Sequence, residues 1–183
     1  FDFYAVTGTA GTHNFLATDT QGTIPAGTYG NVTFTANWIA KTDTVYTIAI
    51  YKMNTSGNYT NVSAIEVSRD DGTTDANLEV SYNEDYTSIF VNGMEYSYDG
   101  FKVDETRLPA ATKVVAAGTT VLNVYFERNQ YTVTLVKQEG IDTFTVNGQT
   151  TTATIYYEAE VNIVVTVLPG YTWDGFAVSG TTP

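Results

Sequence analysis

Two stretches of the chain have nearly the same order of residues, and this repetition constrains the fold more than any other feature. Each contains a Gly-Thr turn, an alternating run with aromatic residues near its end, a short polar segment and a Tyr-Thr strand pattern. They occupy residues 25–50 and 116–135. Tyr46 and Tyr131 begin the final strand of each stretch and are 85 residues apart (131 − 46), a size suited to one small domain. The sequence therefore predicts compact β-modules in series, with each stretch closing one module and opening the next.

The repeat divides the chain into three parts. We expect residues 1–41 to be the second half of a module, residues 45–128 a complete module, and residues 131–183 the first half of a further module. A second internal match supports this division, because residues 96–103 and 171–178 agree at five of eight positions. The chain is thus expected to begin and end at the same phase of the repeat. We expect the first half-module of one copy to combine with the second half-module of another, head to tail.

Alternation of polar and apolar side chains predicts a mainly β fold, and no long helical period is present. Strands are expected at residues 45–51, 59–67, 78–82, 121–126 and 131–136, and a buried strand at 161–167. Between Asp104 and Lys113 we expect either one helical turn or an irregular connection.

Two Asn-Gly pairs predict hairpins. Asn92-Gly93 stands between two short apolar runs, and both residues tolerate the positive φ of a type I′ turn. Asn147-Gly148 has the same setting, so residues 144–157 are expected to form a second hairpin.

Charge and composition exclude several classes of function. The net charge is −12, from 20 acidic and 8 basic residues, and this field repels nucleic acids and anionic lipid surfaces. There is no cysteine, so disulfides and thiolate chemistry are excluded. No apolar run reaches the ~20 residues of a membrane span, so no membrane insertion is expected in this sequence. No signal peptide opens the chain, so targeting and anchoring segments of an exported protein are expected outside it.

The motifs resemble the internalin B-repeat group of bacterial surface proteins, which includes the Listeria–Bacteroides repeat and a related mucin-binding-type repeat. The matching segments are residues 24–38, 46–51, 57–60, 122–129, 131–134 and 169–176. The resemblance implies tandem small β-grasp-like modules with little or no helix, in an extracellular protein that is secreted or anchored to the cell wall. Residues 69–77 and the Asn92-Gly93 hairpin are longer than the usual pattern, which predicts an elaborated central sheet.

Few residues suggest catalysis or metal binding. The single histidine, His13, lies in a Gly/Thr-rich run without the nucleophile and orienting carboxylate that a triad needs. Asp70, Asp71, Asp75 and Glu79 could bind calcium through oxygen ligands, but their spacing departs from the EF-hand pattern and a solvated acidic loop is the default. We expect no cofactor and no enzymatic activity.

Aromatic residues around the Asp-Gly motif are the candidates for ligand binding. Tyr98, Phe101, Trp173 and Phe176 could stack on sugars, although rings in strand patterns usually fill the core of a small module. The leading hypothesis is therefore a non-enzymatic structural or adhesive segment, a stalk that contacts neighbouring modules or copies of itself. The alternative is a module that binds a host glycoprotein or carbohydrate.

Overall fold

The computed structural model describes residues 4–7, 13–15, 33–36, 39–175 and 177–180, the first three segments by their backbone alone. The described strands are β1 (Tyr4–Thr7), β2 (His13–Phe15), β3 (Thr33–Ala36), β4 (Thr44–Lys52), β5 (Ile65–Gly72), β6 (Val80–Tyr82), β7 (Ser88–Val91), β8 (Met94–Ser97), β9 (Phe101–Val103), β10 (Thr120–Arg128), β11 (Gln130–Thr134), β12 (Ile141–Val146), β13 (Thr152–Tyr156) and β14 (Ile163–Val167). The helical residues within these ranges form one 3₁₀ turn, η1 (Glu105–Arg107). The prediction of a mainly β fold with little helix is confirmed. Within the same described ranges, no helix has the length and apolar character needed to cross a membrane.

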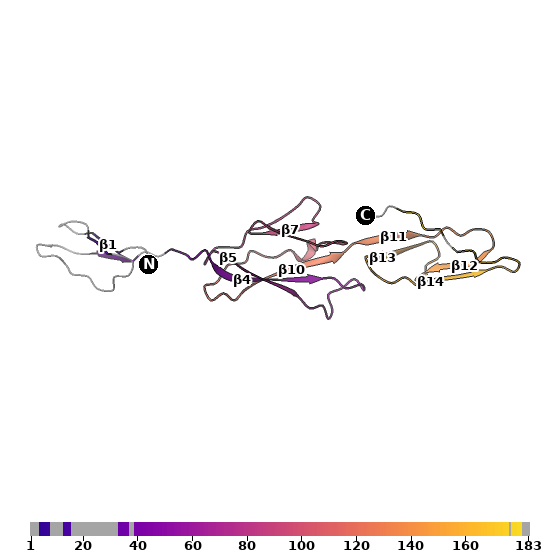
Figure 1. Cartoon of the computed structure of the whole chain (residues 1–183), viewed down its shortest axis with the longest axis horizontal. Helices are drawn as coiled ribbons and strands as arrows, with labels where there is room; N and C mark the ends of the chain where they lie inside the picture. Colours follow the sequence, from indigo (N-terminus) through magenta and orange to yellow (C-terminus); the bar gives the residue numbers. More distant parts are fainter. Residues whose placement is uncertain (1–3, 8–12, 16–32, 37–38, 176, 181–183) are drawn as a thin grey trace, which may run out of the picture.

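The strands form several small sheets that follow one another along the molecule (Figure 1). One end holds the sheet β2-β1-β3, the middle holds the sheets β5-β4-β10-β9 and β6-β7-β8, and the other end holds the pairs β11-β13 and β12-β14. The module boundaries predicted from the sequence, 1–41, 45–128 and 131–183, remain a prediction.

The central sheet is organised by a parallel pair. β4 and β10 pair in parallel over seven residue pairs, from Tyr46 opposite Thr120 to Lys52 opposite Phe126. On the outer edges, β5 pairs antiparallel with β4, and β9 pairs antiparallel with β10. Parallel strands are stable when both faces are covered, so this pair belongs at the centre of a module.

The central core comes from the alternation that the sequence predicts. Every second residue of β10 from Thr120 to Phe126 is buried, whereas Val121 and Asn123 between them are exposed. These side chains pack with β4, β7 and β9 into one cluster of fully or nearly fully buried residues: Tyr46, Ile48, Ile50, Leu78, Ile89, Val91, Phe101, Val103, Val114, Leu122, Val124 and Phe126. Burial of this kind, at about 25 cal/mol per Å² of apolar surface, is the main stabilising term of a small module.

The Asn92-Gly93 hairpin is confirmed. β7 and β8 pair antiparallel with Val91 opposite Met94, and the two turn residues have φ values of 46° and 75°. Asp104 caps η1, so the segment after β9 contains one helical turn followed by an irregular connection.

Three local predictions differ from the structure. The strand expected at residues 59–67 overlaps β5 only from Ile65 to Val67, because β5 begins at Ile65 and runs on to Gly72, through two acidic residues assigned to a loop. The hairpin expected at residues 144–157 is wrong, although its turn forms with positive φ at Asn147 and Gly148. The strands on either side of that turn pair elsewhere, β12 with β14 and β13 with β11. Finally, β14 is largely exposed and not buried.

Candidate functional site

The predicted ligand-binding residues Tyr98 and Phe101 lie where the central module meets β11 and β13, not on an open surface. Phe101 is buried and makes an edge-to-face contact with Tyr157, with ring centroids 6.1 Å apart. Tyr98 packs edge-on against Phe126 at 5.1 Å. Lys52 places its ammonium 4.6 Å from the centre of the Tyr98 ring and 4.3 Å from that of Phe101. Phe101 is buried and Tyr98 is half-buried, and Lys52 lies beside both rings, so both residues make packing contacts at this junction.

Arg128 is the central polar residue of this junction. Its guanidinium lies 4.8 Å from the Phe101 ring centre. Nε donates to the Met53 carbonyl at 2.8 Å, and Nη1 donates to the Tyr157 carbonyl at 2.7 Å and to the Glu158 carboxylate at 2.8 Å. One side chain therefore joins the end of β4, the end of β10 and the end of β13 by charge-assisted hydrogen bonds.

Backbone and glycine packing close the same junction. Only Asn129 separates β10 from β11, and its amide donates to the Gly100 carbonyl while its carbonyl accepts from the Tyr157 amide. Gly100 has a φ of +74°, and a Cβ there would overlap the Tyr157 ring. Gly57 stands in the same relation to the Tyr156 ring. Both glycines are needed because two tyrosines from the following segment lie directly on the backbone.

The other two predicted aromatic residues are in a different part of the chain. Trp173 follows β14 and is 41% exposed, and the neighbouring Tyr171 is 49% exposed. Phe176 lies outside the described residues. The contacts of Tyr98 and Phe101 given above therefore do not include Trp173.

The predicted calcium ligands are also separate. Asp71 accepts from Arg69 Nη2 at 2.7 Å and from the Tyr46 hydroxyl at 3.0 Å. Asp75 pairs with Lys113 at 3.0 Å. No group of three or more acidic or histidine side chains within the described ranges could hold a metal ion, so calcium binding has no geometric support and stays a prediction.

The Asp71 carboxylate instead completes a part-buried hydrogen-bonded network. Burial raises the pKa of Asp71, but the hydrogen bonds from Arg69 and Tyr46 outweigh it and hold the pKa below its usual value. Burial and the adjacent Asp71 raise the pKa of Tyr46 well above 10. A tyrosine that is held neutral and a carboxylate that is held ionised with its own arginine are poor candidates for proton transfer near neutral pH.

Asp104 forms a second network of the same kind. It is 2% exposed, and its carboxylate accepts from the Thr106 amide and hydroxyl at 2.9 and 2.6 Å and from Arg107 Nη1 at 2.7 Å. The Tyr59 hydroxyl donates to it at 3.1 Å, with Arg107 stacked 4.9 Å from the ring centre. The arrangement anchors η1 and the turn after β4 to the core.

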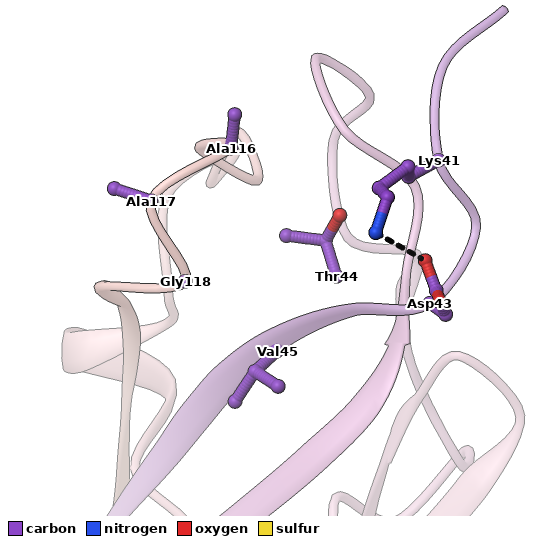
Figure 2. Close-up of a pocket in the computed structure, with 7 residues that line it drawn as sticks. All are labelled: Lys41, Asp43, Thr44, Val45, Ala116, Ala117 and Gly118. Carbon is purple, nitrogen blue, oxygen red and sulfur yellow. Dashed lines mark ion pairs between the residues drawn. The ribbon is translucent and has the colours of Figure 1, made fainter.

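The hollow in Figure 2 has a volume of about 310 Å³ and lies between the start of β4 and a turn before β10. Its lining consists of Lys41, Asp43, Thr44, Val45, Ala116, Ala117 and Gly118. Its only charged groups, Lys41 and Asp43, are exposed and face each other at 3.8 Å (Figure 2). Its buried polar side chain, Thr44, already shares a hydrogen bond with the Thr74 hydroxyl at 2.6 Å, and the rest of the lining offers no cluster of polar groups that could orient a small molecule.

Sequence reasoning missed the residues that matter most at the junction, namely Arg128, Tyr157 and Met53. The signal was present, because Arg128 is one of only 8 basic residues and stands two positions before β11. Its partners are 29 and 75 residues away in sequence, however, and periodicity cannot pair them.

Comparisons with family models, with curated proteins and with solved structures found no match to this chain.

Proposed function

We propose that this chain is a non-enzymatic spacer that carries tension, a repeat segment of a secreted or cell-surface bacterial protein of the kind that the resemblance to internalin B-repeats implies. The observation that carries the proposal is the parallel pairing of β4 with β10. These strands are the first and last of the residue 45–128 module.

The parallel pair determines how the module responds to tension. Force enters a serial array at the start of β4 and leaves at the end of β10. Because the strands are parallel, those two points lie at opposite ends of the ladder. Pulling them apart slides β4 along β10 and loads all seven residue pairs together, whereas an unzipping force loads them one at a time.

The junction passes that force to the next segment. β10 continues into β11 across the single residue Asn129, and Arg128 holds both sides together through three hydrogen bonds. Hydrogen bonds to charged groups contribute about 1.5–3 kcal/mol each, so the connection is stiffer than a polar linker. A short, bonded connection suits a spacer that transmits position as well as tension.

Single-molecule pulling tests the proposal, since the absence of native cysteine lets engineered thiols set the pulling points. Asp43→Cys with Gln130→Cys pulls the two strands in shear. Thr55→Cys with Gln130→Cys pulls from the ends of β4 and β10 that lie side by side. We expect the shear geometry to resist several-fold more force. Equal unfolding forces in the two geometries would contradict the proposal.

A second candidate function, binding of a host glycoprotein or carbohydrate, is favoured by one observation. Tyr171 and Trp173 are exposed within three residues of each other, as stacking platforms for sugars are. Glycan-array binding that is lost in Trp173→Ala would support it, provided that the near-ultraviolet circular dichroism of the other aromatic side chains is unchanged. No binding above background to glycans or mucin would rule it out.

A further inference from the structure

The edge of β11 differs from that of its counterpart β4. β4 has a strand on each side, β5 antiparallel and β10 parallel. β11 pairs with β13 and stands at the edge of its sheet in the described part of the chain. Tyr46 lies opposite a β5 residue and Tyr131 opposite a β13 residue in the same antiparallel sense. The open edge of β11 therefore corresponds to the edge of β4 that β10 covers.

Apolar exposure surrounds this edge. Tyr46 is fully buried in the central module, whereas its repeat counterpart Tyr131 is 41% exposed. Val103 is 1% exposed, because β9 lies on β10, whereas its counterpart Val178 is 87% exposed. The core around β11 and β13 has three buried apolar residues, against twelve in the central module. Among the described strands, none occupies beside β11 the position that β10 occupies beside β4.

The chain itself contains a second strand of the β10 type. β3 pairs with β1 as β10 pairs with β9, with Phe34 opposite Val6 and Phe126 opposite Val103. In both ladders the residue after the phenylalanine lies opposite the residue before the valine, so the two ladders have the same register and Phe34 aligns with Phe126. β3 is an edge strand in the order β2-β1-β3, so its second edge is unpaired by the described strands.

We propose that the open edge of β11 accepts β3 from a second copy of this chain, in parallel, as β4 accepts β10. The register follows from the central module, where Tyr51 lies opposite Tyr125. Val136 follows Tyr131 by five residues, as Tyr51 follows Tyr46, and Thr33 precedes Phe34, as Tyr125 precedes Phe126. The same register therefore places Val136 of one copy opposite Thr33 of the next. The inference rests on the proposed spacer function and specifies how spacers join.

The geometry of this contact leads to an open assembly. The proposed contact joins an acceptor edge at β11 to a donor strand at β3, and these are different surfaces. A contact between different surfaces is heterologous and continues from copy to copy unless the rotation closes a ring. Strand addition supplies main-chain hydrogen bonds for affinity and side-chain pockets for register.

Net charge opposes the assembly and provides a control. Each copy carries −12 charges, so copies repel one another at low ionic strength. Salt at 0.15 M shortens the Debye length to about 8 Å. Association is therefore expected to strengthen with salt, the opposite of an assembly driven by ion pairs.

The first experiment uses the whole chain without substitutions. Sedimentation velocity across a concentration series is expected to show growing oligomers, and more of them at higher salt. Hydrogen exchange on the same samples is expected to slow several-fold at residues 130–136 as oligomers form, with β4 and β10 unchanged. A single monomeric species at every concentration and salt would overturn the proposal, and so would oligomers without added protection at 130–136.

The second experiment tests the register. One copy carries Thr33→Cys and a second, of different mass, carries Val136→Cys. Mild oxidation is expected to link them, since partners in neighbouring strands fall within disulfide range. Val121→Cys, on an exposed position of β10, replaces Val136→Cys in the matched control and is expected to give several-fold less of the mixed dimer. Equal yields from the two pairs would overturn the proposed register.

The two proposals fail separately. A monomer that resists shear in the pulling experiment would leave the spacer function in place and remove the strand addition. If the chain assembles but its central module unfolds at the same force in both pulling geometries, the strand addition stands and the spacer function is removed.

Discussion

Tyr46 and Tyr131 stand at matching positions of two similar stretches of sequence, yet Tyr46 is fully buried and Tyr131 is 41% exposed. The difference lies in what covers the strand. β4 has β10 beside it, whereas β11 has an open edge among the described strands. Identical residues in equivalent strands therefore contribute very different free energies.

This contrast predicts unequal effects of two matched substitutions. Tyr46→Ala removes a buried ring and its hydroxyl bond to Asp71, and is expected to lower the free energy of unfolding of the central module by about 3–5 kcal/mol. Tyr131→Ala is expected to cost about 1 kcal/mol or less. Urea unfolding at a concentration where the chain is monomeric measures both. Similar losses would mean that the two strands have equivalent surroundings.

Gly100 and Gly93 allow the junction to be tested apart from backbone strain. Their φ values are +74° and +75°, but a Cβ at Gly93 meets no atom, whereas at Gly100 it overlaps Tyr157. Both alanine variants carry the cost of a left-handed residue, roughly 1–2 kcal/mol. Gly100→Ala is expected to lose more and to shift the Tyr157 ring resonances. An equal loss of stability in the two variants, read from thermal unfolding, would argue against close packing at the junction.

The sequence was informative where structure depends on neighbours in the chain. Alternation located β4, β10 and β11, and the Asn-Gly pairs located both turns, because side-chain period and φ preference are local properties. It was wrong about the strands around Asn147-Gly148. A tight turn specifies only that the chain reverses, and the longer-range packing sent β12 to β14 and β13 to β11.

The junction could not be predicted for a similar reason. Phe101 has the pattern of a core residue and also the chemistry of a sugar platform, and the choice depends on whether Tyr157 covers it. From the sequence, Arg128 is indistinguishable from an exposed charged residue, because its partners Met53 and Tyr157 are far away along the chain. β14 pairs with β12 alone among the described strands and its side chains stay largely exposed, so its run of apolar residues was not enough to predict burial.

Arg128→Lys tests the polar part of the junction while keeping the charge. Lysine cannot reproduce the fork that reaches both Met53 and Tyr157, so a loss of about 1.5–3 kcal/mol is expected. Small-angle scattering is expected to show a wider range of overall lengths. Lys113→Gln is the matched control, because it breaks an exposed ion pair with Asp75 that is worth about 1 kcal/mol or less. If the two variants behave alike, Arg128 does not hold the segments together.

Asp104 makes the stability of the central module depend on acid. Burial raises the pKa of Asp104, but hydrogen bonds from Thr106, Arg107 and Tyr59 outweigh it and hold the pKa below the ordinary value of 3.8. The unfolded chain therefore binds a proton more readily than the folded one. Stability from this group is complete above that ordinary value and declines as the pH falls through the lower, folded-state pKa.

Asp104→Asn removes this dependence. At pH 7 the variant is expected to be less stable by about 1–3 kcal/mol, because the amide cannot replace the charged partner of Arg107. As the pH falls below 3.8 the wild-type carboxyl gains its proton, so the difference between the two proteins is expected to narrow. Urea unfolding midpoints measured from pH 7 down to acid give this difference directly. A constant gap between variant and wild type over that range would show that the Asp104 carboxylate is not the group that couples folding to pH.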